Sequence, residues 1–309
     1  MRHQVTILLL FGFFITLHAE TYRIISYNVE NLFDATHDTL KNDLDFTPTG
    51  KYRWTYTRFR HKAHQIARTI CQIGQWETPL MVGICEVENE NCVRQLIRQL
   101  PSYPYAYLHR ESPDERGIDV AVLYDSTRFH ILHWNILPVP LNGDKTRDIL
   151  YAKGLTASGD TLHLMMCHLP SMRGGKAQSE WKRQRAKQVI QHHTDSILRS
   201  TPQAFILVMG DMNSDTKNDI KGLNNCMVAL EKEGIGSYKW QGQWSCLDQM
   251  YVSPALIPHT QARIFSADNL LTPDKRYMGK QPRRTFTGYR YDKSGVSDHL
   301  PAYLDWQTE

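Results

Sequence analysis

The chain has 309 residues, of which 41% are hydrophobic and 22% are charged. This length suffices to bury one sizeable core and is too short to require two. Lys and Arg number 36 against 32 Asp and Glu, so the net charge at pH 7 is +4. Proteins that live on nucleic acid usually carry a stronger positive bias, and the charge alone therefore does not indicate such a partner.

The start of the chain has the pattern of a secretory signal peptide. Arg2 gives a positive start, Val5–Leu17 is almost wholly apolar, and Ala19 is a small residue of the kind that a signal peptidase accepts. The apolar part is shorter than the roughly 20 residues that a membrane-spanning helix needs. We expect a signal peptide at 1–19 and an exported protein, periplasmic or secreted, with one domain at 20–309 and no stable membrane insertion. An ordinary N-terminal strand or a membrane anchor is the alternative.

Short runs of β-branched, aromatic and aliphatic residues recur along the whole chain and predict strands. We expect these strands at Tyr22–Asn28, Leu80–Glu86, Tyr103–His109, Ile118–Tyr124, Phe129–Leu137, Leu150–Ala157, Leu162–His168, Ala204–Gly210, Leu247–Val252 and Ala262–Phe265. Because many of them follow one another directly, the sheets should be largely antiparallel or mixed and covered by helices in a single α+β domain.

Apolar side chains at helical spacing predict one helix that starts near Thr57 and another that starts near Lys176. A shorter helix is expected over Glu90–Leu100, with Asn89 placed to cap it. These helices separate groups of strands and should cover the sheets.

The six cysteines match neither a small disulfide scaffold nor a CxxC zinc site. Cys226 with Cys246 is the one pair that we consider as a disulfide bridge.

The expected strands repeatedly adjoin side chains that can bind a metal or carry a proton. Apolar runs lead to Asn28 and Glu30, to Glu86, to His168, and to Asp211 and Asn213, whereas Asp248, Asp298 and His299 stand just before such runs. Strand ends at one edge of a sheet pair can converge on one cleft. Each residue alone is better explained by turn or cap chemistry, so the hypothesis of a shared site depends on the whole set.

These residue types fit the hydrolysis of a phosphate ester. Magnesium prefers oxygen ligands and keeps several waters, so one or two carboxylates, amide oxygens and a substrate phosphate suffice. Hydrolysis also needs an oriented water, neutralisation of phosphoryl charge and help for the leaving oxygen, which histidines and aspartates can supply. The sequence contains no HExxH, GxxxxGK[ST], GxSxG or paired CxxC motif.

The chain resembles the endonuclease/exonuclease/phosphatase superfamily in the order of six motifs: Asn28-Val-Glu30, Glu86, His168-Leu-Pro-Ser171, Gly210-Asp211-Met-Asn213, Asp248-Gln-Met-Tyr-Val-Ser253 and Ser297-Asp298-His299. The resemblance extends from about Tyr22 to Leu304. It implies a four-layer sandwich, in which two packed mixed β-sheets are flanked by helices and carry a site at one end.

The resemblance also implies a metal site. Glu86 would be the principal metal ligand, with Asn28 and Glu30 beside it. Mg²⁺ would be the cofactor, and Mn²⁺ a substitute. Asp211 and Asn213 would orient the attacking water and the phosphate.

Two histidines would carry the remaining chemistry by the same resemblance. His299, supported by Asp248 or Asp298, would contact the phosphate or activate water. His168 would be the second catalytic histidine and assist the leaving group. We also expect substrate contacts from Arg116, Ser171 and Arg173, although the Arg173 segment is equally explained as a glycine turn before a helix.

Two segments, Asn42–Arg60 and Pro273–Ser297, are expected to be long surface loops that combine basic and aromatic residues. Such loops can hold phosphates and stack bases, or can be solvated surface. We expect a monomeric nuclease acting on phosphodiester bonds of nucleic acid. The alternatives are a phospholipid or sugar-phosphate phosphodiesterase or phosphatase of the same fold, and a non-catalytic binding module.

Overall fold

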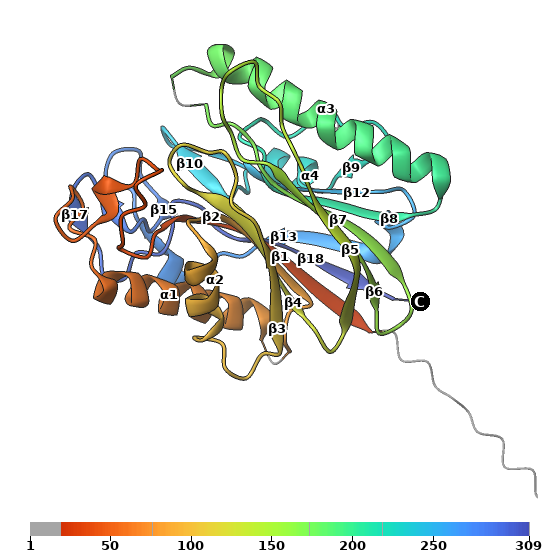
Figure 1. Ribbon diagram of the computed structural model, residues 1–309, viewed down its shortest axis with the longest axis horizontal. Coiled ribbons are helices and arrows are strands. Elements are labelled where there is room, and N and C mark those ends of the chain that lie inside the picture. Colours follow the sequence, from red (N-terminus) through yellow and green to blue (C-terminus); the bar gives the residue numbers. More distant parts are fainter. Residues whose placement is uncertain (1–19, 76, 173, 218, 309) are drawn as a thin grey trace, which may run out of the picture.

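A computed structural model describes residues 20–75, 77–172, 174–217 and 219–308. The expected signal peptide at 1–19 and the expected substrate contact Arg173 lie outside these ranges. Two six-stranded β-sheets pack face to face, with helices on both outer faces (Figure 1). The predicted fold class, an α+β sandwich of two packed mixed sheets flanked by helices, is confirmed.

The first sheet, which we call sheet A, contains the first and last strands of the domain. Its order is β13 (Thr260–Ile264), β18 (Ala302–Gln307), β1 (Thr21–Leu32), β2 (Met81–Val87), β4 (Asp119–Asp125) and β3 (Tyr105–His109). β1 and β2 are parallel, and the other neighbours are antiparallel. Helix α1 (Tyr56–Gly74) connects the parallel pair, as a crossover between parallel strands requires.

The second sheet, sheet B, repeats this arrangement. Its order is β5 (Phe129–Leu137), β6 (Ile149–Thr156), β7 (Thr161–His168), β8 (Phe205–Asp211), β12 (Asp248–Val252) and β9 (Asn224–Asn225). β7 and β8 are its parallel pair, and helix α3 (Lys176–Ser200) connects them. Each sheet therefore contains one β-α-β unit.

Smaller elements complete the domain. They are the helices α2 (Glu90–Ile97) and α4 (Val228–Lys232), the hairpins β10 (Tyr238–Trp240) with β11 (Gln243–Ser245), β14 (Leu271–Pro273) with β15 (Lys280–Pro282) and β16 (Phe286–Thr287) with β17 (Arg290–Tyr291), and the short 3-10 turns η1 (Leu44–Phe46), η2 (Ile257–His259) and η3 (Asp268–Leu270). No helix within the described ranges is long and apolar enough to cross a membrane.

Strand β8 shows how the sequence pattern produces the layers. Its side chains are buried on both faces, which accounts for the continuous apolar run. Ile206 and Val208 pack in the cluster under α3, whereas Leu207 and Met209 pack in the cluster between the sheets. Gly83 of β2, on the facing sheet, lets the two sheets pack closely, because a Cβ there would lie 2.5 Å from Met166 Sδ.

Most predicted elements are found within one to three residues of their expected bounds. Helix α2 is capped by Asn89, whose side chain accepts a hydrogen bond from Cys92 N at 3.0 Å. The expected strands do not include β18, which lies between β13 and β1 in sheet A. Cys226 and Cys246 are free thiols, so the bridge considered from the sequence is absent.

The two expected surface loops are more ordered than predicted. Within Asn42–Arg60, Trp54 is fully buried and its Nε1 donates to Phe33 O at 2.8 Å, and α1 begins at Tyr56. Within Pro273–Ser297, three short strands form. Much of each segment is exposed loop, as predicted, but aromatic residues of the two segments also pack against each other, with the ring centroids of Tyr52 and Phe286 4.7 Å apart.

The two ends of the described domain meet. Glu20 N donates to Thr308 Oγ1 at 3.0 Å, and Thr308 N donates to Glu20 O at 2.9 Å. Both residues lie at the ends of β1 and β18 that are remote from Asn28 and His299.

Candidate active site

The two parallel strand pairs end at the same place. Asn28 of β1 and Glu86 of β2 come from sheet A, and His168 of β7 and Asp211 of β8 come from sheet B. Asn28 Nδ2 donates to Asp211 Oδ2 at 3.0 Å, and this bond joins the two sheets across the site. The carboxyl ends of neighbouring parallel strands lie at one edge of a sheet, so the fold brings these predicted residues together.

Irregular backbone aims these side chains into the cleft. Glu86 has φ 67° and Asn31 has φ 56°, both in the left-handed region that costs energy for residues other than glycine. The register of β1 with β2 shifts between Asn28 and Leu32, and that of β2 with β4 shifts between Cys85 and Val87. Such bulges redirect a side chain next to active sites.

The Glu86 carboxylate has one oxygen held by the backbone and one facing the cleft. Oε2 accepts a hydrogen bond from Asn31 N at 2.9 Å. Oε1 lies 3.9 Å from a guanidinium nitrogen of Arg116 and 3.9 Å from His168 Nε2, both too far for a hydrogen bond. The side chain is 14% exposed, so Oε1 can take a cation from solvent. This oxygen fits the role of a magnesium ligand.

His168 is buried and uncharged. Burial, and next the positive charges of Arg147 and Arg116, hold the pKa of His168 well below its usual value. Its Nε2 lies 3.6 Å from Asp211 Oδ2. A neutral imidazole beside a carboxylate can accept or pass on a proton during hydrolysis.

Arg147 lies behind His168 and was not predicted to belong to the site. Its guanidinium donates to His168 O at 3.3 Å and to Leu169 O at 2.9 Å, and pairs with Asp114 at 3.0 Å. It is 7% exposed. Arg147 thus fixes the end of β7. The sequence offers no local signal for it beyond a basic residue before a strand.

His299 is held as a cation by Asp248. The distance from His299 Nδ1 to Asp248 Oδ2 is 2.6 Å. Burial disfavours the charged ring, but the negative charge of Asp248 and its hydrogen bond outweigh this and raise the pKa of His299 well above its usual value. The other ring nitrogen, Nε2, lies 3.9 Å from both Asp211 Oδ2 and Asp298 Oδ1. The protonated Nε2–H is therefore available to an anion in the cleft.

Asp211 lies between the two histidines. Its Oδ1 accepts from Asn213 N at 2.9 Å. Burial raises the pKa of Asp211 to about 7, although the charge of His299 acts against this. Gly210 before it has φ 141°, and a Cβ there would lie 1.8 Å from Cys167 O, so only glycine fits this approach of β8 to β7. The Asn213 side chain donates to Leu169 O at 3.0 Å, which ties the following loop to β7.

Glu30 belongs to a neighbouring group of charges. Its Oε1 accepts from Arg284 Nε at 3.0 Å, and its Oε2 accepts from Thr285 N at 2.9 Å. The other side of the Arg284 guanidinium pairs with Asp298 at 2.9 Å. Burial, and next the charge of Asp298, raise the pKa of Glu30 to about 7. Glu30 is thus turned toward Arg284, whereas Glu86 faces the histidines.

Lys62 of α1 is a further buried charge that the sequence did not reveal. It is 2% exposed, and its Nζ donates to the backbone oxygen of Glu30 and, at 2.6 Å, to Thr285 Oγ1. Burial lowers the pKa of Lys62 to about 8. Its position on the apolar face of a helix was the only available signal.

The expected substrate contacts differ in placement. Arg116 reaches toward Glu86 and its side chain is 40% exposed at the cleft. Ser171 is exposed, three residues beyond His168. In the described ranges, no three His, Cys, Asp or Glu side chains are arranged to hold a metal alone. A cation at Glu86 would therefore use amide, water and substrate oxygens as well.

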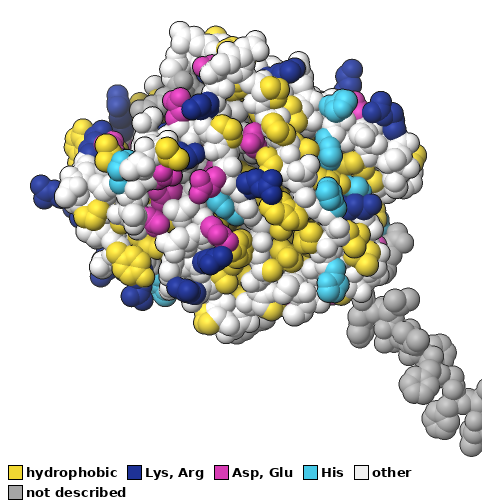
Figure 2. All heavy atoms as spheres, in the orientation of Figure 1, with side chains coloured by type: hydrophobic (Ala, Val, Ile, Leu, Met, Phe, Trp, Pro, Cys, Tyr) yellow, Lys and Arg dark blue, Asp and Glu magenta, His cyan; other side chains and the backbone are white. Residues whose placement is uncertain are grey.

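The surface around these residues carries both signs of charge. Figure 2 shows acidic side chains gathered left of the centre of the visible face, bordered by Lys and Arg. An open carboxylate oxygen, a neutral histidine and a cationic histidine around one cleft are groups that can bind a cation, move a proton and neutralise an anion.

Comparison with known proteins places the chain. The model of the Endonuclease/Exonuclease/phosphatase family matches residues 23–308. A search of curated proteins finds no significant match.

Several solved structures share the fold at low sequence identity. An endonuclease/exonuclease/phosphatase family protein from Bacteroides thetaiotaomicron is 14% identical, with a TM-score of 0.61 and coverage of 94% of this chain and 99% of that one. D. rerio TDP2 complexed with single strand DNA product is 19% identical, with a TM-score of 0.59 and coverage of 93% and 99%. A mannosyl-6-phosphatase from Bacteroides thetaiotaomicron is 16% identical, with a TM-score of 0.59 and coverage of 93% and 100%.

The motifs that suggested this family from the sequence lie together at one end of the sandwich, and the family model spans nearly the whole described domain. Members of the family hydrolyse phosphate esters and generally depend on a divalent cation. The chain belongs to the endonuclease/exonuclease/phosphatase family.

Proposed function

We propose that the protein is a magnesium-dependent phosphodiesterase that cleaves nucleic acid by attack of water on phosphorus. The observation that carries this proposal is the convergence of cationic His299, neutral His168 and Asp211, with the open oxygen of Glu86 beside them. A non-catalytic binding module would have no need for a buried positive charge on His299 that Asp248 stabilises and that a phosphate would neutralise.

The cation would be held by Glu86 together with the amide oxygen of Asn28, which in the structure accepts a hydrogen bond from Glu30 N at 3.0 Å. Glu30, the other ligand expected from the sequence, would need to release Arg284 or share its oxygens. Magnesium bound there would supply charge neutralisation on the phosphoryl oxygens and help to orient the substrate. Manganese should substitute, because its ligand preference is similar.

The protein side chains would divide the remaining work. The Nε2–H of His299 can bind a phosphoryl oxygen and stabilise the charge that develops on it. Asp211, with its raised pKa, can orient the attacking water and accept its proton. Asn28 holds Asp211 in place through the 3.0 Å bond from Nδ2. His168, whose Nε2 lies 3.6 Å from Asp211 Oδ2, can take up the proton that Asp211 accepts from the water and pass it to the leaving oxygen, so that the neutral imidazole is restored.

Nucleic acid is the first choice of substrate because basic and aromatic residues border the site. Lys51 lies over the rings of Tyr52 and Tyr289, at 5.7 and 5.2 Å from their centroids. Such pairs can bind phosphates and stack bases. The similar D. rerio TDP2 structure contains a single strand DNA product.

A sugar-phosphate phosphatase is the second candidate. It is favoured by the similarity to the mannosyl-6-phosphatase, which covers 93% of the chain. A cleft with Glu86 and two histidines would serve a monoester as well, since the chemistry at phosphorus is shared.

One panel of substrates separates these functions. Turnover of single-stranded DNA, plasmid DNA, sphingomyelin, mannose 6-phosphate and bis-p-nitrophenyl phosphate would be measured with Mg²⁺, with EDTA, and after Mg²⁺ is restored. We expect DNA cleavage that EDTA abolishes and Mg²⁺ restores, and loss of that cleavage in His299→Ala. Full activity after exhaustive chelation would contradict the metal dependence. Hydrolysis of the sugar phosphate alone would replace the nuclease by the second candidate.

We further propose that the protein is exported, on the basis of the pattern at 1–19. Expression of the full chain with fractionation of the cells tests this. Mature protein should begin near Glu20 and be found outside the cytoplasm. An unprocessed chain in the cytoplasm would contradict export without bearing on the hydrolase.

A further inference from the structure

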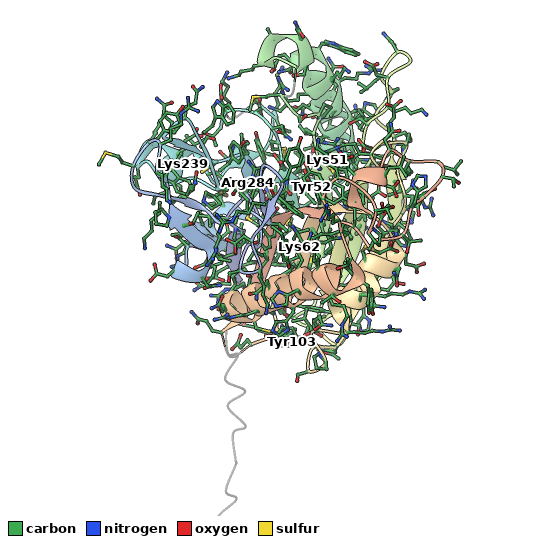
Figure 3. All side chains as sticks on the ribbon, turned by 90° about the vertical axis from the view of Figure 1, so that its left-hand side faces the viewer. Lys51, Tyr52, Lys62, Tyr103, Lys239 and Arg284 are labelled. Carbon is green, nitrogen blue, oxygen red and sulfur yellow. The ribbon has the colours of Figure 1, made fainter. Side chains whose placement is uncertain are left out.

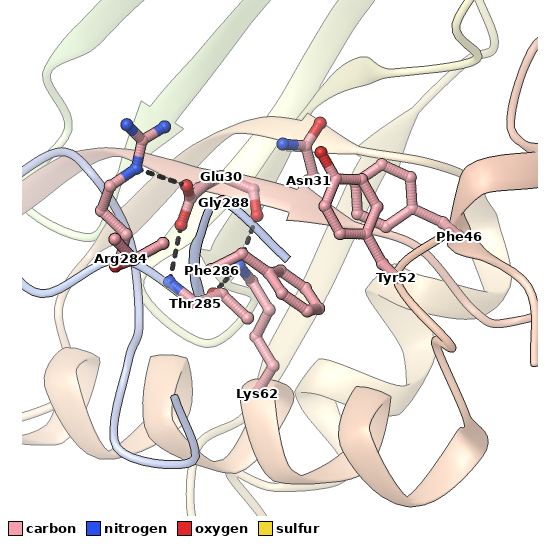
Figure 4. Close-up of a pocket in the computed structure, with 10 residues that line it drawn as sticks. Glu30, Asn31, Phe46, Tyr52, Lys62, Arg284, Thr285, Phe286 and Gly288 are labelled. Carbon is pink, nitrogen blue, oxygen red and sulfur yellow. Dashed lines mark hydrogen bonds and ion pairs between the residues drawn. The ribbon is translucent and has the colours of Figure 1, made fainter. Parts of the chain in front are cut away.

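A hollow of about 280 Å³ opens beside the candidate active site (Figure 4). Its lining comes from the bulged end of β1, the segment before α1, α1 itself, and the β16–β17 hairpin with the two residues before it. The residues that matter below are Glu30, Asn31, Phe46, Tyr52, Arg284 and Phe286.

One wall of the hollow is aromatic. The ring of Tyr52 lies 4.8 Å from that of Phe46 and 4.7 Å from that of Phe286, and all three are partly exposed. Lys51 Nζ lies 5.7 Å from the ring centroid of Tyr52 and 5.2 Å from that of Tyr289, and Tyr289 is 70% exposed. Partly exposed rings that are fixed by their neighbours offer a ready surface for a flat group.

The charged groups of the hollow are already paired with one another. Lys62 at its base is bound to Glu30 O and Thr285 Oγ1, and Arg284 joins Glu30 to Asp298. The side-chain amide of Asn31 points toward Tyr52 at the top of the hollow in Figure 4. The occupant is therefore expected to be flat, uncharged and able to pair with an amide. A nucleobase has these properties, and asparagine pairs with base edges through both its donor and its acceptor.

Residues that line the hollow also contact the proposed catalytic residues. Asn31 N donates to Glu86 Oε2 at 2.9 Å. On the other side, Arg284 binds Asp298, whose Oδ1 lies 3.9 Å from His299 Nε2. Figure 3 shows Arg284, Tyr52 and Lys51 near one another on the same side of the molecule. A substrate whose phosphate bound between Glu86 and His299 could therefore place its adjoining group in the hollow.

We propose that this hollow binds the nucleobase next to the scissile phosphate, stacked against Tyr52 and within reach of the Asn31 amide. The proposal rests on the nuclease function proposed above. A base inside a duplex cannot enter such a hollow without being unstacked, so the enzyme should prefer single-stranded nucleic acid or strand ends.

The test uses an oligonucleotide with one cleavable bond. In this short single-stranded DNA, every linkage except the cleavable one is a methylphosphonate. Three substrates are compared: one with all bases, one that lacks the base on the 5′ side of the cleavable bond, and one that lacks the base on the 3′ side. Stacking of a base on an aromatic side chain is worth about 1–3 kcal/mol, which corresponds to roughly 5- to 150-fold. We expect Tyr52→Leu to lower kcat/KM on the intact substrate about 10-fold and to have no effect when the base that fills the hollow is missing.

Two further variants make the result specific. Tyr52→Phe keeps the ring and should retain the wild-type preference for the intact substrate. Tyr103→Leu is the matched control, because Tyr103 is also a partly exposed tyrosine but lies beside Gly74, the last residue of α1, and well away from Tyr52 (Figure 3). It should change neither substrate. Thermal unfolding of each variant shows whether a loss of activity comes from a loss of folded protein.

The outcomes separate this inference from the function on which it rests. If wild-type protein cleaves the oligonucleotide and Tyr52→Leu affects intact and abasic substrates equally, the base site is wrong and the nuclease stands. If no oligonucleotide is cleaved, both proposals fail. If Tyr52→Leu instead lowers the hydrolysis of mannose 6-phosphate, the hollow holds a sugar, and the nucleobase assignment is overturned.

Discussion

Asp248 Oδ2 lies 2.6 Å from Nδ1 of His299, and this pair connects the end of sheet B to the loop that precedes the last strand of sheet A. Asp248 is fully buried, and its backbone N donates to Ser237 Oγ at 3.1 Å, which fixes the start of β12. The pair therefore sets both the orientation of the imidazole and its charge.

Asp248→Asn should shift the pH dependence of hydrolysis. The raised pKa of His299 means that its stabilising charge is fully present below the usual histidine pKa and is lost as the pH rises through the folded-state pKa. Without the negative charge of Asp248 the pKa of His299 falls, because burial then dominates. The alkaline limb of the profile of kcat/KM against pH should move to lower pH, and folding stability near neutral pH should drop. An unchanged alkaline limb would assign that limb to another group.

His168→Ala should lower turnover by about 100-fold or more, as is typical for loss of a group that moves a proton in the transition state. The fold should survive, because Nδ1 of His168 has no hydrogen-bond partner in the described residues and the ring is uncharged. His64→Ala, at an exposed position of α1, is the control. Near wild-type rates of His168→Ala on every cleaved substrate would remove His168 from the catalytic set.

Glu86→Gln should weaken magnesium binding more than it harms stability. The substitution removes the charge of Oε1 but keeps a side-chain oxygen that can accept the hydrogen bond from Asn31 N. Calorimetric titration with Mg²⁺ should show a lower affinity for Glu86→Gln and an unchanged affinity for Glu90→Gln, which alters an exposed carboxylate of α2. Equal affinities for both variants would move the metal site elsewhere.

Gly83→Ala should destabilise the fold by about 1–3 kcal/mol, the usual cost of an added methyl group in a packed core. The new Cβ would lie 2.5 Å from Met166 Sδ and 2.6 Å from Met209 Cε, so the sheets must separate or the methionines must move. Urea unfolding should show a lower midpoint with an unchanged slope. Full stability would mean that the methionine side chains yield without cost.

The site residues that could be predicted from the sequence are polar residues that end an apolar, strand-like run. Glu86 and His168 end apolar strands, where a polar residue stands out, and the parallel pairs then bring them together. Arg147 and Lys62 could not be found, because each gains its meaning from partners far away in the chain, such as Asp114 and Thr285.

The last strand shows the opposite case. β18 was absent from the list of expected strands although Ala302, Leu304 and Trp306 are buried in alternation with Tyr303 and Asp305, which is a strand pattern of period two. Its apolar character was visible, but its place inside sheet A, between β13 and β1, depends on pairing with β1 at the other end of the chain. Such pairing cannot be read from local sequence.

That pairing has a topological consequence. Because Glu20 and Thr308 hydrogen bond to each other, a short peptide could join them and make the domain circular. The ring could then be opened at Gly159, in the exposed turn between β6 and β7, at the end of β7 remote from His168. Termini that lie close together at the surface tolerate this kind of circular permutation. A permuted chain would have its strands in a different order along the sequence but the same strands side by side in each sheet. The geometry of the cleft should therefore be kept.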